Sequence, residues 1–385
     1  MKIAVDAQLL ITKEKTGIGW NAYNMLHAML NQKQAKFRLD YFSQPAYSLQ
    51  EEVLLEFQKA GCLLNGSNRL SAPLYKSLCE FLPLQHKWFF GSDSSIDAYH
   101  FFNYFVPPHI DAKANVIATI HDTAFKAYPD TVPKKTRALM ELSLPKTCKR
   151  AQAIITVSEF SKQEIVKYLG VNPDKIMVAY NGVDYNRFHP NYAKATIEQV
   201  KNKFSINREY FLYVGTLEPR KNIERLIDAY ALLKSRLHDI PLLVLAGRKG
   251  WMYDTIFKKI QKLHLEKDII FTGYISSADE PLLMRGALAF LFVSLYEGFG
   301  MPPLEAMACG TPVMVSNCSS LPEVVGQSAL LSDPLSIDEI AEKMELLLNS
   351  PELRASLSEN GIKRAREFDW DEPAKKLLNL FKSLS

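Results

Sequence analysis

Two acidic residues enclose a glycine- and proline-rich stretch of the chain. Glu297 and Glu305 bracket Gly298, Phe299 and Gly300 in the segment EGFGMPPLEAMACG, which follows the apolar run LAFLFVSLY. Glycines let a backbone approach a ligand closely, prolines suit the first turn of a helix, and N–H groups at a helix start suit an anion. A carboxylate such as Glu305 can accept two hydrogen bonds from a vicinal diol, and Glu297 precedes the helix on a loop, free to face a ligand. The stretch predicts a site for an anionic ligand that carries hydroxyl groups.

A second segment, GTLEPRKN, places two cations at a turn between a predicted strand and a predicted helix. Arg220 and Lys221 follow the apolar run EYFLYV. At such a turn they can neutralise a diphosphate and stabilise it further as it departs with growing charge. The spacing is not that of a P-loop, which disfavours hydrolysis of nucleoside triphosphates. A solvated cation pair at a helix start is the alternative interpretation.

Two weaker signals lie in the N-terminal half. Gly17 and Gly19 follow the first predicted strand, but position 22 holds Ala22 where a dinucleotide fingerprint has its third glycine. His121 ends the run NVIATI, where it could donate a hydrogen bond to a hydroxyl or a phosphate. An ordinary tight turn and a histidine satisfied by backbone groups are the alternatives.

Short apolar runs alternate with amphipathic stretches, a pattern typical of a doubly wound parallel sheet. The pattern occurs twice. The first set of expected strands covers residues 2–10, 37–43, 97–103, 115–122 and 152–158, and the second set covers 209–215, 241–247, 268–274, 288–294, 311–316 and 328–333. Helices are expected over 21–32, 162–169, 223–234 and 303–308, with a linker near 184–195 rich in Asn and Pro. In this architecture, ligands bind beyond the carboxyl ends of the strands.

The composition is that of an ordinary globular protein. The 385 residues are 47% hydrophobic and 23% charged, with a formal net charge of +4, which gives little support for a nucleic-acid partner. Five cysteines without a CxxC pair are expected to be reduced thiols. No apolar run reaches the ~18 residues of a membrane span, and MKIAVDAQLL predicts a strand rather than a secretory signal. We therefore expect a cytoplasmic protein.

Together these motifs resemble the retaining GT-B glycosyltransferases of family 4. The likeness covers almost the whole chain, including VSEFSKQEIVKYLGVNPDKIMVAYNGVD, AGRKG and FTGYIS, and is nearest to bacterial mannosyl- and rhamnosyltransferases of surface-polysaccharide assembly. It implies an α/β fold of two Rossmann-like parallel-sheet domains facing across a cleft. Residues 1–185 would form the acceptor-side domain and residues 186–365 the donor-nucleotide domain. Residues 366–385 would form a helix that crosses back to the first domain.

The resemblance also implies roles for individual residues. Catalytic roles would fall to His121, Arg220, Lys221 and Glu297, and donor-binding roles to Gly17, Gly19, Arg248, Tyr274, Gly298, Phe299, Gly300 and Glu305. Arg220 and Lys221 would hold the diphosphate, Glu305 the ribose, and Glu297 hydroxyls of the transferred sugar. The base would lie near Arg248 and Tyr274. Some relatives carry an arginine where this chain has Thr216, so phosphate neutralisation would fall on Arg220 and Lys221 alone.

The implied reaction moves a hexosyl group from a nucleotide-diphospho-sugar, GDP-mannose being the first expectation, to a glycan or lipid-linked glycan. The leaving phosphate would help deprotonate the acceptor hydroxyl, and anomeric configuration would be retained. No cofactor and no metal are expected. Asp369-Trp370-Asp371 has the form of a DxD metal motif, but it lies in the final helical region rather than at a strand end.

Other functions remain open at this point. A sugar-nucleotide epimerase or a phosphorylase could share the fold, although a pyridoxal-dependent phosphorylase would be far longer. A non-catalytic sugar-nucleotide-binding subunit is a third possibility. Conversion of a lone sugar nucleotide, or the absorbance of a bound cofactor, would separate these classes.

A basic segment in the N-terminal half suggests a membrane partner. The segment YPDTVPKKTRALMELSLPKTCKR holds six cations interleaved with four apolar residues: Lys134, Lys135, Arg137, Lys146, Lys149 and Arg150, with Leu139, Met140, Leu142 and Leu144. Cations beside an apolar helical stripe suit an anionic membrane surface, where they would bring the enzyme to a lipid-linked acceptor. An ordinary solvated helix packed on the sheet is the alternative.

Overall fold

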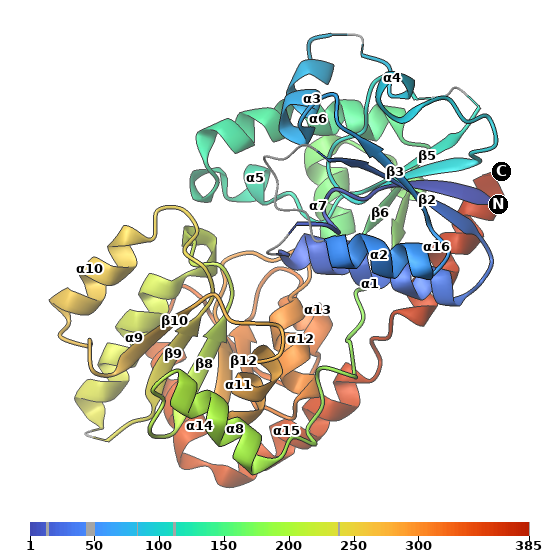
Figure 1. The fold of residues 1–385 in the computed structure, drawn as a ribbon. Helices are drawn as coiled ribbons and strands as arrows, with labels where there is room; N and C mark the ends of the chain where they lie inside the picture. Colours follow the sequence, from blue (N-terminus) through green and yellow to red (C-terminus); the bar gives the residue numbers. More distant parts are fainter. Residues whose placement is uncertain (13–14, 44–50, 83, 111–112, 238, 385) are drawn as a thin grey trace. The chain divides into compact units, whose positions relative to one another are not determined.

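The computed structural model describes residues 1–12, 15–43, 51–82, 84–110, 113–237 and 239–384. The chain divides into two compact units (Figure 1). The first comprises Met1–Ala127, Lys134–Asn181 and Asp369–Ser385, and the second comprises Tyr128–Pro133 and Gly182–Phe368. No helix in the described ranges is long and apolar enough to cross a membrane.

The first unit is built on a parallel sheet which, over the described residues, has seven strands in the order β3-β2-β1-β4-β5-β6-β7. The strands are β1 (Lys2–Asp6), β2 (Lys36–Phe42), β3 (Leu63–Ser67), β4 (Ala98–Phe101), β5 (Asn115–Thr119), β6 (Ala153–Thr156) and β7 (Ile176–Val178). The helices are α1 (Gly17–Asn31), α2 (Glu51–Lys59), α3 (Ala72–Cys79), α4 (Lys87–Phe90), α5 (Ala124–Ala127), α6 (Lys134–Arg150), α7 (Glu159–Leu169) and α16 (Asp371–Leu384), with a 3-10 turn η2 (Pro173–Lys175).

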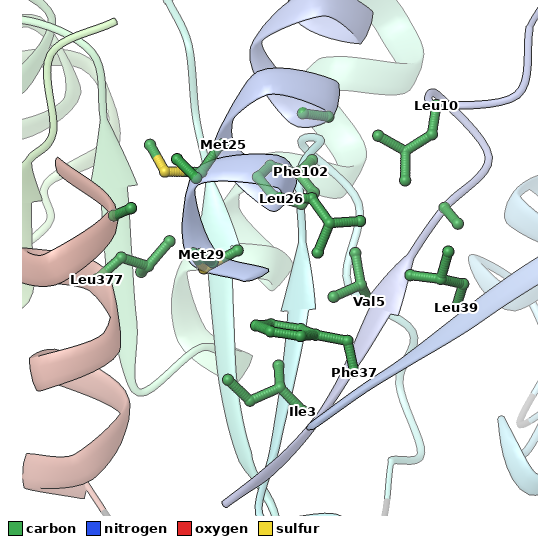
Figure 2. Close-up of a cluster of buried hydrophobic side chains, with 14 of the residues drawn as sticks. Ile3, Val5, Leu10, Met25, Leu26, Met29, Phe37, Leu39, Phe102 and Leu377 are labelled. Carbon is green, nitrogen blue, oxygen red and sulfur yellow. The ribbon is translucent and has the colours of Figure 1, made fainter. Parts of the chain in front are cut away.

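One face of this sheet is covered by buried apolar side chains. Ile3 and Val5 of β1, with Phe37 and Leu39 of β2, pack under Met25, Leu26 and Met29 of α1 in Figure 2, and Leu377 of α16 joins them. Helices α1 and α16 lie side by side there (Figure 1). Alternation along a strand sends every second residue to this face. Each large aliphatic side chain buried here contributes roughly 1.5–3 kcal/mol of transfer free energy.

The opposite face carries a different set of side chains. The residues of β2 that alternate with Phe37 and Leu39 include Arg38, Asp40 and Phe42, and all three are buried. A cluster of aromatic and small residues from β2, α3, α4 and the following loops packs here: Phe42, Ala72, Tyr75, Cys79, Phe90 and Phe105. The first sheet therefore has one mainly apolar face and one face that mixes aromatic and charged groups.

The second unit repeats the design. Its described residues form a parallel sheet of six strands in the order β10-β9-β8-β11-β12-β13. The strands are β8 (Tyr210–Val214), β9 (Leu242–Ala246), β10 (Ile269–Gly273), β11 (Ala289–Phe292), β12 (Val313–Ser316) and β13 (Leu330–Ser332). The helices are α8 (Lys194–Lys203), α9 (Ile223–Arg236), α10 (Asp254–Lys262), α11 (Glu280–Gly286), α12 (Met301–Ala308), α13 (Leu321–Val325), α14 (Ile337–Asn349) and α15 (Pro351–Ala365), with 3-10 turns η1 (Pro129–Thr131) and η3 (Pro219–Lys221).

Each sheet has one point at which its strand order reverses direction. In the first sheet the chain moves outward from β1 to β2 and β3, then returns to the other side of β1 with β4. In the second sheet the same reversal falls between β8 and β11. Loops diverge at such a point, so a crevice forms beyond the carboxyl ends of the two strands. Both units thus have a position suited to a ligand.

The expected α/β fold of two parallel-sheet domains is confirmed, with differences in detail. All eleven expected strands are present, and β3 and β7 are additional. Helix α1 begins at Gly17 rather than Asn21, so Gly17 and Gly19 lie in the first turn of the helix and not in a loop before it. The prediction of a glycine loop there is wrong.

Candidate active site

Arg220 and Lys221 lie in η3, immediately beyond the carboxyl end of β8. Asn222 ends the turn with φ of 60° and is the N-cap of α9. Its buried side-chain amide donates to the carbonyl oxygens of Val293 at 2.9 Å and Pro334 at 2.7 Å. This amide anchors the cationic turn to the loops that follow β11 and β13, so the two cations are held on a rigid element.

Both cations pair with Glu297, which follows β11. The Lys221 Nζ lies 2.6 Å from Glu297 Oε1, and Arg220 Nη1 lies 3.2 Å from Glu297 Oε2. Arg220 also pairs with Glu218 at 2.8 Å and donates to the carbonyl oxygen of Tyr296 at 2.7 Å. Glu297 was expected to be free on its loop, and this is corrected: its side chain is 9% exposed and held by two cations.

The charge balance of this cluster is even. Burial raises the pKa of Glu297, but the charges of Lys221 and Arg220 outweigh burial and leave the pKa below its ordinary value. Two carboxylates, Glu218 and Glu297, thus face two cations. An arriving dianion can take over the hydrogen bonds of Arg220 and Lys221 without a large rearrangement of the backbone.

The loop between Glu297 and α12 is tightly fixed. The Ser320 hydroxyl lies 2.9 Å from the carbonyl oxygens of both Glu297 and Phe299. Gly300 has φ of 106°, and a Cβ there would lie 2.6 Å from a methyl carbon of Leu321, so only glycine fits. The side chain of Phe299 is buried against Phe368, with ring centroids 5.9 Å apart.

The first turn of α12 offers fewer anion-binding groups than the sequence suggested. Pro302 and Pro303 have no N–H, and the Leu304 N–H bonds to the Gly300 carbonyl oxygen at 3.5 Å. Backbone contributions to a ligand would therefore come from the loop itself, around Gly298, Phe299 and Gly300. The main charge available to an anion is that of Arg220 and Lys221.

Glu305 lies in the second turn of α12, near Glu280 of α11. Burial raises the pKa of Glu305 well above its ordinary value, and the charge of Glu280 adds to the rise. Arg187 pairs with Glu280 at 3.3 Å and donates to the Ser277 carbonyl oxygen at 3.1 Å. Within the described residues, the Glu305 carboxyl group forms no hydrogen bond or ion pair. It is an acceptor that a diol could satisfy.

Arg248 and Tyr274 follow β9 and β10 at the same edge of the sheet. Arg248 is exposed, and the side chain of Tyr274 is 50% exposed. The loops after β8 and β9 are joined by their backbones, because the Leu217 N–H donates to the Arg248 carbonyl oxygen at 3.0 Å. The structure thus brings Arg220, Lys221, Glu297 and Glu305, with Arg248 and Tyr274, to the carboxyl edge of one sheet.

The remaining predicted residues belong to the first unit. His121 Nε2 lies 3.1 Å from the Phe102 carbonyl oxygen, and burial lowers the pKa of the imidazole. The ring is therefore neutral, with its proton on Nε2, and Nδ1 is a hydrogen-bond acceptor. The bond to Phe102 matches the alternative of a histidine satisfied by backbone groups, and a role of His121 towards a ligand stays a prediction. Gly19 is buried in α1, where a Cβ would lie 3.0 Å from the Leu9 carbonyl oxygen.

The DxD-like triplet begins helix α16. Asp369 Oδ1 accepts from the Glu372 N–H at 2.8 Å, and Asp371 accepts from Gln32 at 3.3 Å. These carboxylates have capping and packing roles. Across the described ranges, no group of three or more His, Cys, Asp or Glu residues is arranged to hold a metal ion.

Sequence reasoning missed three residues that shape the site. Glu218 is the second carboxylate on Arg220, Asn222 locks the cationic turn, and Ser320 fixes the glycine loop. Glu218 and Asn222 stand in the GTLEPRKN segment itself and could have been found there. Ser320 follows β12 and carries no local motif.

Comparison with known proteins identifies the family. A family model described as "Glycosyl transferases group 1" matches residues 195–364, and one described as "Glycosyltransferase Family 4" matches residues 47–187. The chain is 35% identical over 289 residues to O-antigen chain mannosyltransferase B of Escherichia coli, covering 74% of each protein. The chain belongs to glycosyltransferase family 4.

Further comparisons support the same placement of this family 4 glycosyltransferase. It is 33% identical over 227 residues to the serotype-specific mannosyltransferase WbdA of Escherichia coli, covering 58% of this chain and 28% of that protein. The crystal structure of Anabaena HepE in complex with UDP and glucose matches with a TM-score of 0.73 at 20% identity, over the whole of both chains. The GT-B fold is thereby confirmed, and the glycosyltransferase class rests on the family.

Proposed function

We propose that this glycosyltransferase transfers a mannosyl group from a nucleotide-diphospho-sugar, GDP-mannose first, to a glycan or lipid-linked glycan, with retention of configuration and without a metal. The observation that carries the proposal is the cluster of Arg220, Lys221 and Glu297 at the β8/β11 reversal. Mannose is supported by the relatives, which are named as mannosyltransferases.

In the proposed reaction, the bond from the anomeric carbon of the donor sugar to the diphosphate oxygen breaks. The acceptor oxygen forms a bond to the same carbon, and its proton passes to an oxygen of the leaving diphosphate. Negative charge grows on the diphosphate as the bond breaks, and Arg220 and Lys221 stabilise that charge at a fixed position. Glu297, ionised at neutral pH, orients Lys221 and accepts from hydroxyls of the transferred sugar.

The other residues hold the donor on either side of this centre. Glu305 binds the ribose diol, because its half-buried carboxyl group has no hydrogen bond or ion pair within the described residues and can accept from two hydroxyl groups. The base lies beside Arg248 and Tyr274, at the ends of β9 and β10. In the first unit, His121 Nδ1 is an acceptor suited to a sugar hydroxyl, whereas Gly19 allows α1 to pack against the Leu9 backbone.

The first test is a panel of sugar nucleotides with the purified protein. A donor at ~100 times its dissociation constant should stabilise the protein by about 2.7 kcal/mol. Transfer is then followed with GDP-mannose and a mannose-terminated oligosaccharide, and NMR of the product gives the anomeric configuration. Conversion of a lone sugar nucleotide to its epimer would replace this proposal with an epimerase, and an inverted product would contradict retention.

We also propose that helix α6 brings the enzyme to an anionic membrane. Ser143, Leu144, Thr147 and Cys148 face the core, while Lys134 and Lys135 are exposed at the start of the helix. Arg137 was expected to be a third such cation, but it pairs with Glu141 at 3.3 Å. Lys146 pairs with Glu80 and Arg150 donates to the Val106 carbonyl oxygen, whereas Lys149 is exposed. The proposed attraction therefore depends on Lys134, Lys135 and Lys149, and on Leu142, which is 40% exposed.

A further inference from the structure

The first unit has a pocket at the point where its own strand order reverses. The pocket lies beyond the carboxyl ends of β1, β2 and β4, under helix α3 and the start of α4. Asp6 is the last residue of β1, Phe42 the last of β2 and Phe101 the last of β4, and all three line it. The pocket thus occupies the position in a doubly wound sheet that ligands prefer.

Phenylalanine and tyrosine supply half of the residues that line the pocket. The six aromatic residues that line the pocket are Phe42, Tyr75, Phe90, Tyr99, Phe101 and Phe105. The pocket is narrow and open on one side, so it admits an edge of a ligand rather than a whole ring system. Asp6 and Lys76 also line it; their charged atoms are 4.0 Å apart, and each side chain is 17% exposed.

Behind the aromatic wall runs a chain of buried polar groups. Asp40 pairs with Arg38 at 2.8 Å, accepts from Asn65 at 2.7 Å and lies 3.4 Å from His86 Nε2. The other ring nitrogen of His86 lies 3.2 Å from the Tyr75 hydroxyl. The Asp40 and His86 side chains are 4% and 6% exposed. These hydrogen bonds fix the two polar groups that reach the pocket from below, Asp40 and His86.

Packing alone does not require these polar groups. On the opposite face of β1 and β2, the buried side chains of these strands are apolar, so this part of the sheet can be packed without buried polar groups. A buried ion pair is often no more stable than an apolar replacement of the same volume, and the Arg38 Nε is buried without a hydrogen-bond partner in the described chain. Costly polar groups retained beside an open pocket are a mark of a binding site.

We propose that this pocket binds an edge of the acceptor sugar, such as a hydroxymethyl group with its neighbouring ring carbons. The inference rests on the proposed transfer reaction and names the acceptor subsite for it. Aromatic faces suit the C–H groups of a pyranose, and the carboxylate of Asp6 and the ammonium group of Lys76 suit its hydroxyl groups. Because the fixed charges of Asp6 and Lys76 balance, the pocket favours a neutral polyhydroxyl ligand over an ionic one.

The test uses the full chain with a mannose-terminated oligosaccharide as acceptor and GDP-mannose as donor. Asp6→Asn should raise the acceptor KM by about 10-fold or more, since it removes a charged hydrogen-bond acceptor from the site. Donor binding and the slow hydrolysis of donor without acceptor should not change. Glu164→Gln, which breaks an ion pair on α7 in the same unit, is the matched control and should leave the acceptor KM unchanged.

A second variant tests the pocket in case Asp6→Asn does not fold. Ala72→Val adds volume to the pocket wall without removing a charge, and it should also raise the acceptor KM, with the melting temperature of each variant measured beside it. A direct probe is saturation-transfer NMR with methyl α-mannoside, whose signal should fall in both variants.

Two results would overturn the inference: acceptor KM values equal to wild type in both variants, or a crystal soaked in methyl α-mannoside with only water in the pocket. Failure of the proposed function has a different signature. In that case the wild-type protein neither binds nor hydrolyses any sugar nucleotide of the panel, whatever the pocket variants do.

Discussion

The two strand-order reversals of this molecule share a topology and differ in chemistry. At the β8/β11 reversal, Arg220 and Lys221 meet Glu297 within hydrogen-bonding distance. At the β1/β4 reversal, aromatic rings surround Asp6 and Lys76, whose charged atoms are 4.0 Å apart. The backbone design determines where a ligand can bind, and the loop residues determine which ligand that is.

The two sites differ in how their charged groups are held in the absence of a ligand. The cationic site of the second unit holds its charges against Glu218 and Glu297, so a diphosphate has to exchange partners with carboxylates already in place. The pocket of the first unit has one ion pair, Asp6 and Lys76, whose charges balance, and its deeper carboxylate, Asp40, is fixed from behind by Arg38 and Asn65. We expect donor binding to depend strongly on salt and acceptor binding to depend on it weakly.

The largest expected difference between the two sites is produced by Lys221→Ala in the second unit. We expect turnover to fall about 10²–10³-fold, because the lost contact acts on charge that grows as the glycosyl bond breaks. Donor affinity should fall less, and the acceptor KM should not change. The measurement is steady-state kinetics with both substrates varied. An unchanged kcat would remove Lys221 from the mechanism.

Lys221→Ala also strands a buried carboxylate, and this needs its own control. Glu297 would lose its nearest cation, and loss of one member of a buried pair costs about 3–5 kcal/mol. The double variant Lys221→Ala/Glu297→Gln removes that cost and is compared with Glu297→Gln alone. A lower turnover in the double variant than in Glu297→Gln, at an equal melting temperature, would be the catalytic effect of Lys221.

Glu305→Gln addresses the ribose end of the same site. We expect the variant to bind both the sugar nucleotide and the free nucleotide up to about 10-fold more weakly, as for the loss of one hydrogen bond. Acceptor KM should stay unchanged, in contrast to Asp6→Asn. Isothermal calorimetry with GDP is the measurement, and equal affinity for wild type and variant would contradict the assignment.

Glu305→Gln should weaken nucleotide binding but increase the stability of the ligand-free protein. Burial and the charge of Glu280 raise the pKa of Glu305. A carboxyl group whose pKa is raised by folding lowers the free energy of unfolding as pH increases from its ordinary pKa towards its folded one. Glu305→Gln should therefore raise the melting temperature of the ligand-free protein at about pH 8, by about 2–4 °C for each kcal/mol. Well below pH 4 the difference should vanish.

The membrane proposal concerns the first unit alone. Lys134→Gln/Lys135→Gln should weaken binding to anionic vesicles about 10–30-fold, since each lysine near such a surface contributes about 1 kcal/mol. Sedimentation with phosphatidylserine vesicles at low and high salt is the measurement, with Arg137→Gln as a control whose cation is already paired. No sedimentation of the wild type at low salt would favour a soluble acceptor.

The smallest expected effect is that of a chelator. We expect activity to survive EDTA, because Arg220 and Lys221 supply the positive charge for the diphosphate. Initial rates before and after chelation are compared. If EDTA abolishes activity and Mg²⁺ or Mn²⁺ restores it, the donor site needs a metal ion in addition to Arg220 and Lys221.

Much of the fold could be predicted because long apolar runs mark buried parallel strands. Strands β3 and β7 were missed since LLNGS contains Asn and Gly and IMV is only three residues long. Helix α1 was placed too late because glycines are poor helix formers, yet Gly19 is where the helix passes closest to the Leu9 backbone. Tertiary contact overrode local preference there.

The donor site could be found from sequence because its residues stand in two compact segments. The pairing within it could not, since Lys221 and Glu297 are 76 positions apart and no local pattern joins them. The pocket of the first unit is harder still. Asp6, Asp40, Tyr75 and Phe105 are dispersed over two strands, a helix and a loop, and only the folded sheet brings them together.

Helix α16 follows the second unit in the chain but belongs to the first unit. Its residues Ala374, Leu377, Leu378 and Phe381 complete the apolar face of the first unit. During translation, residues 182–368 leave the ribosome before this helix does, so the second unit can reach its final state while the first still exposes an unsealed apolar face. The first unit, whose synthesis starts first, therefore completes its folding after the second unit. Until then its unsealed apolar face is a target for chaperones.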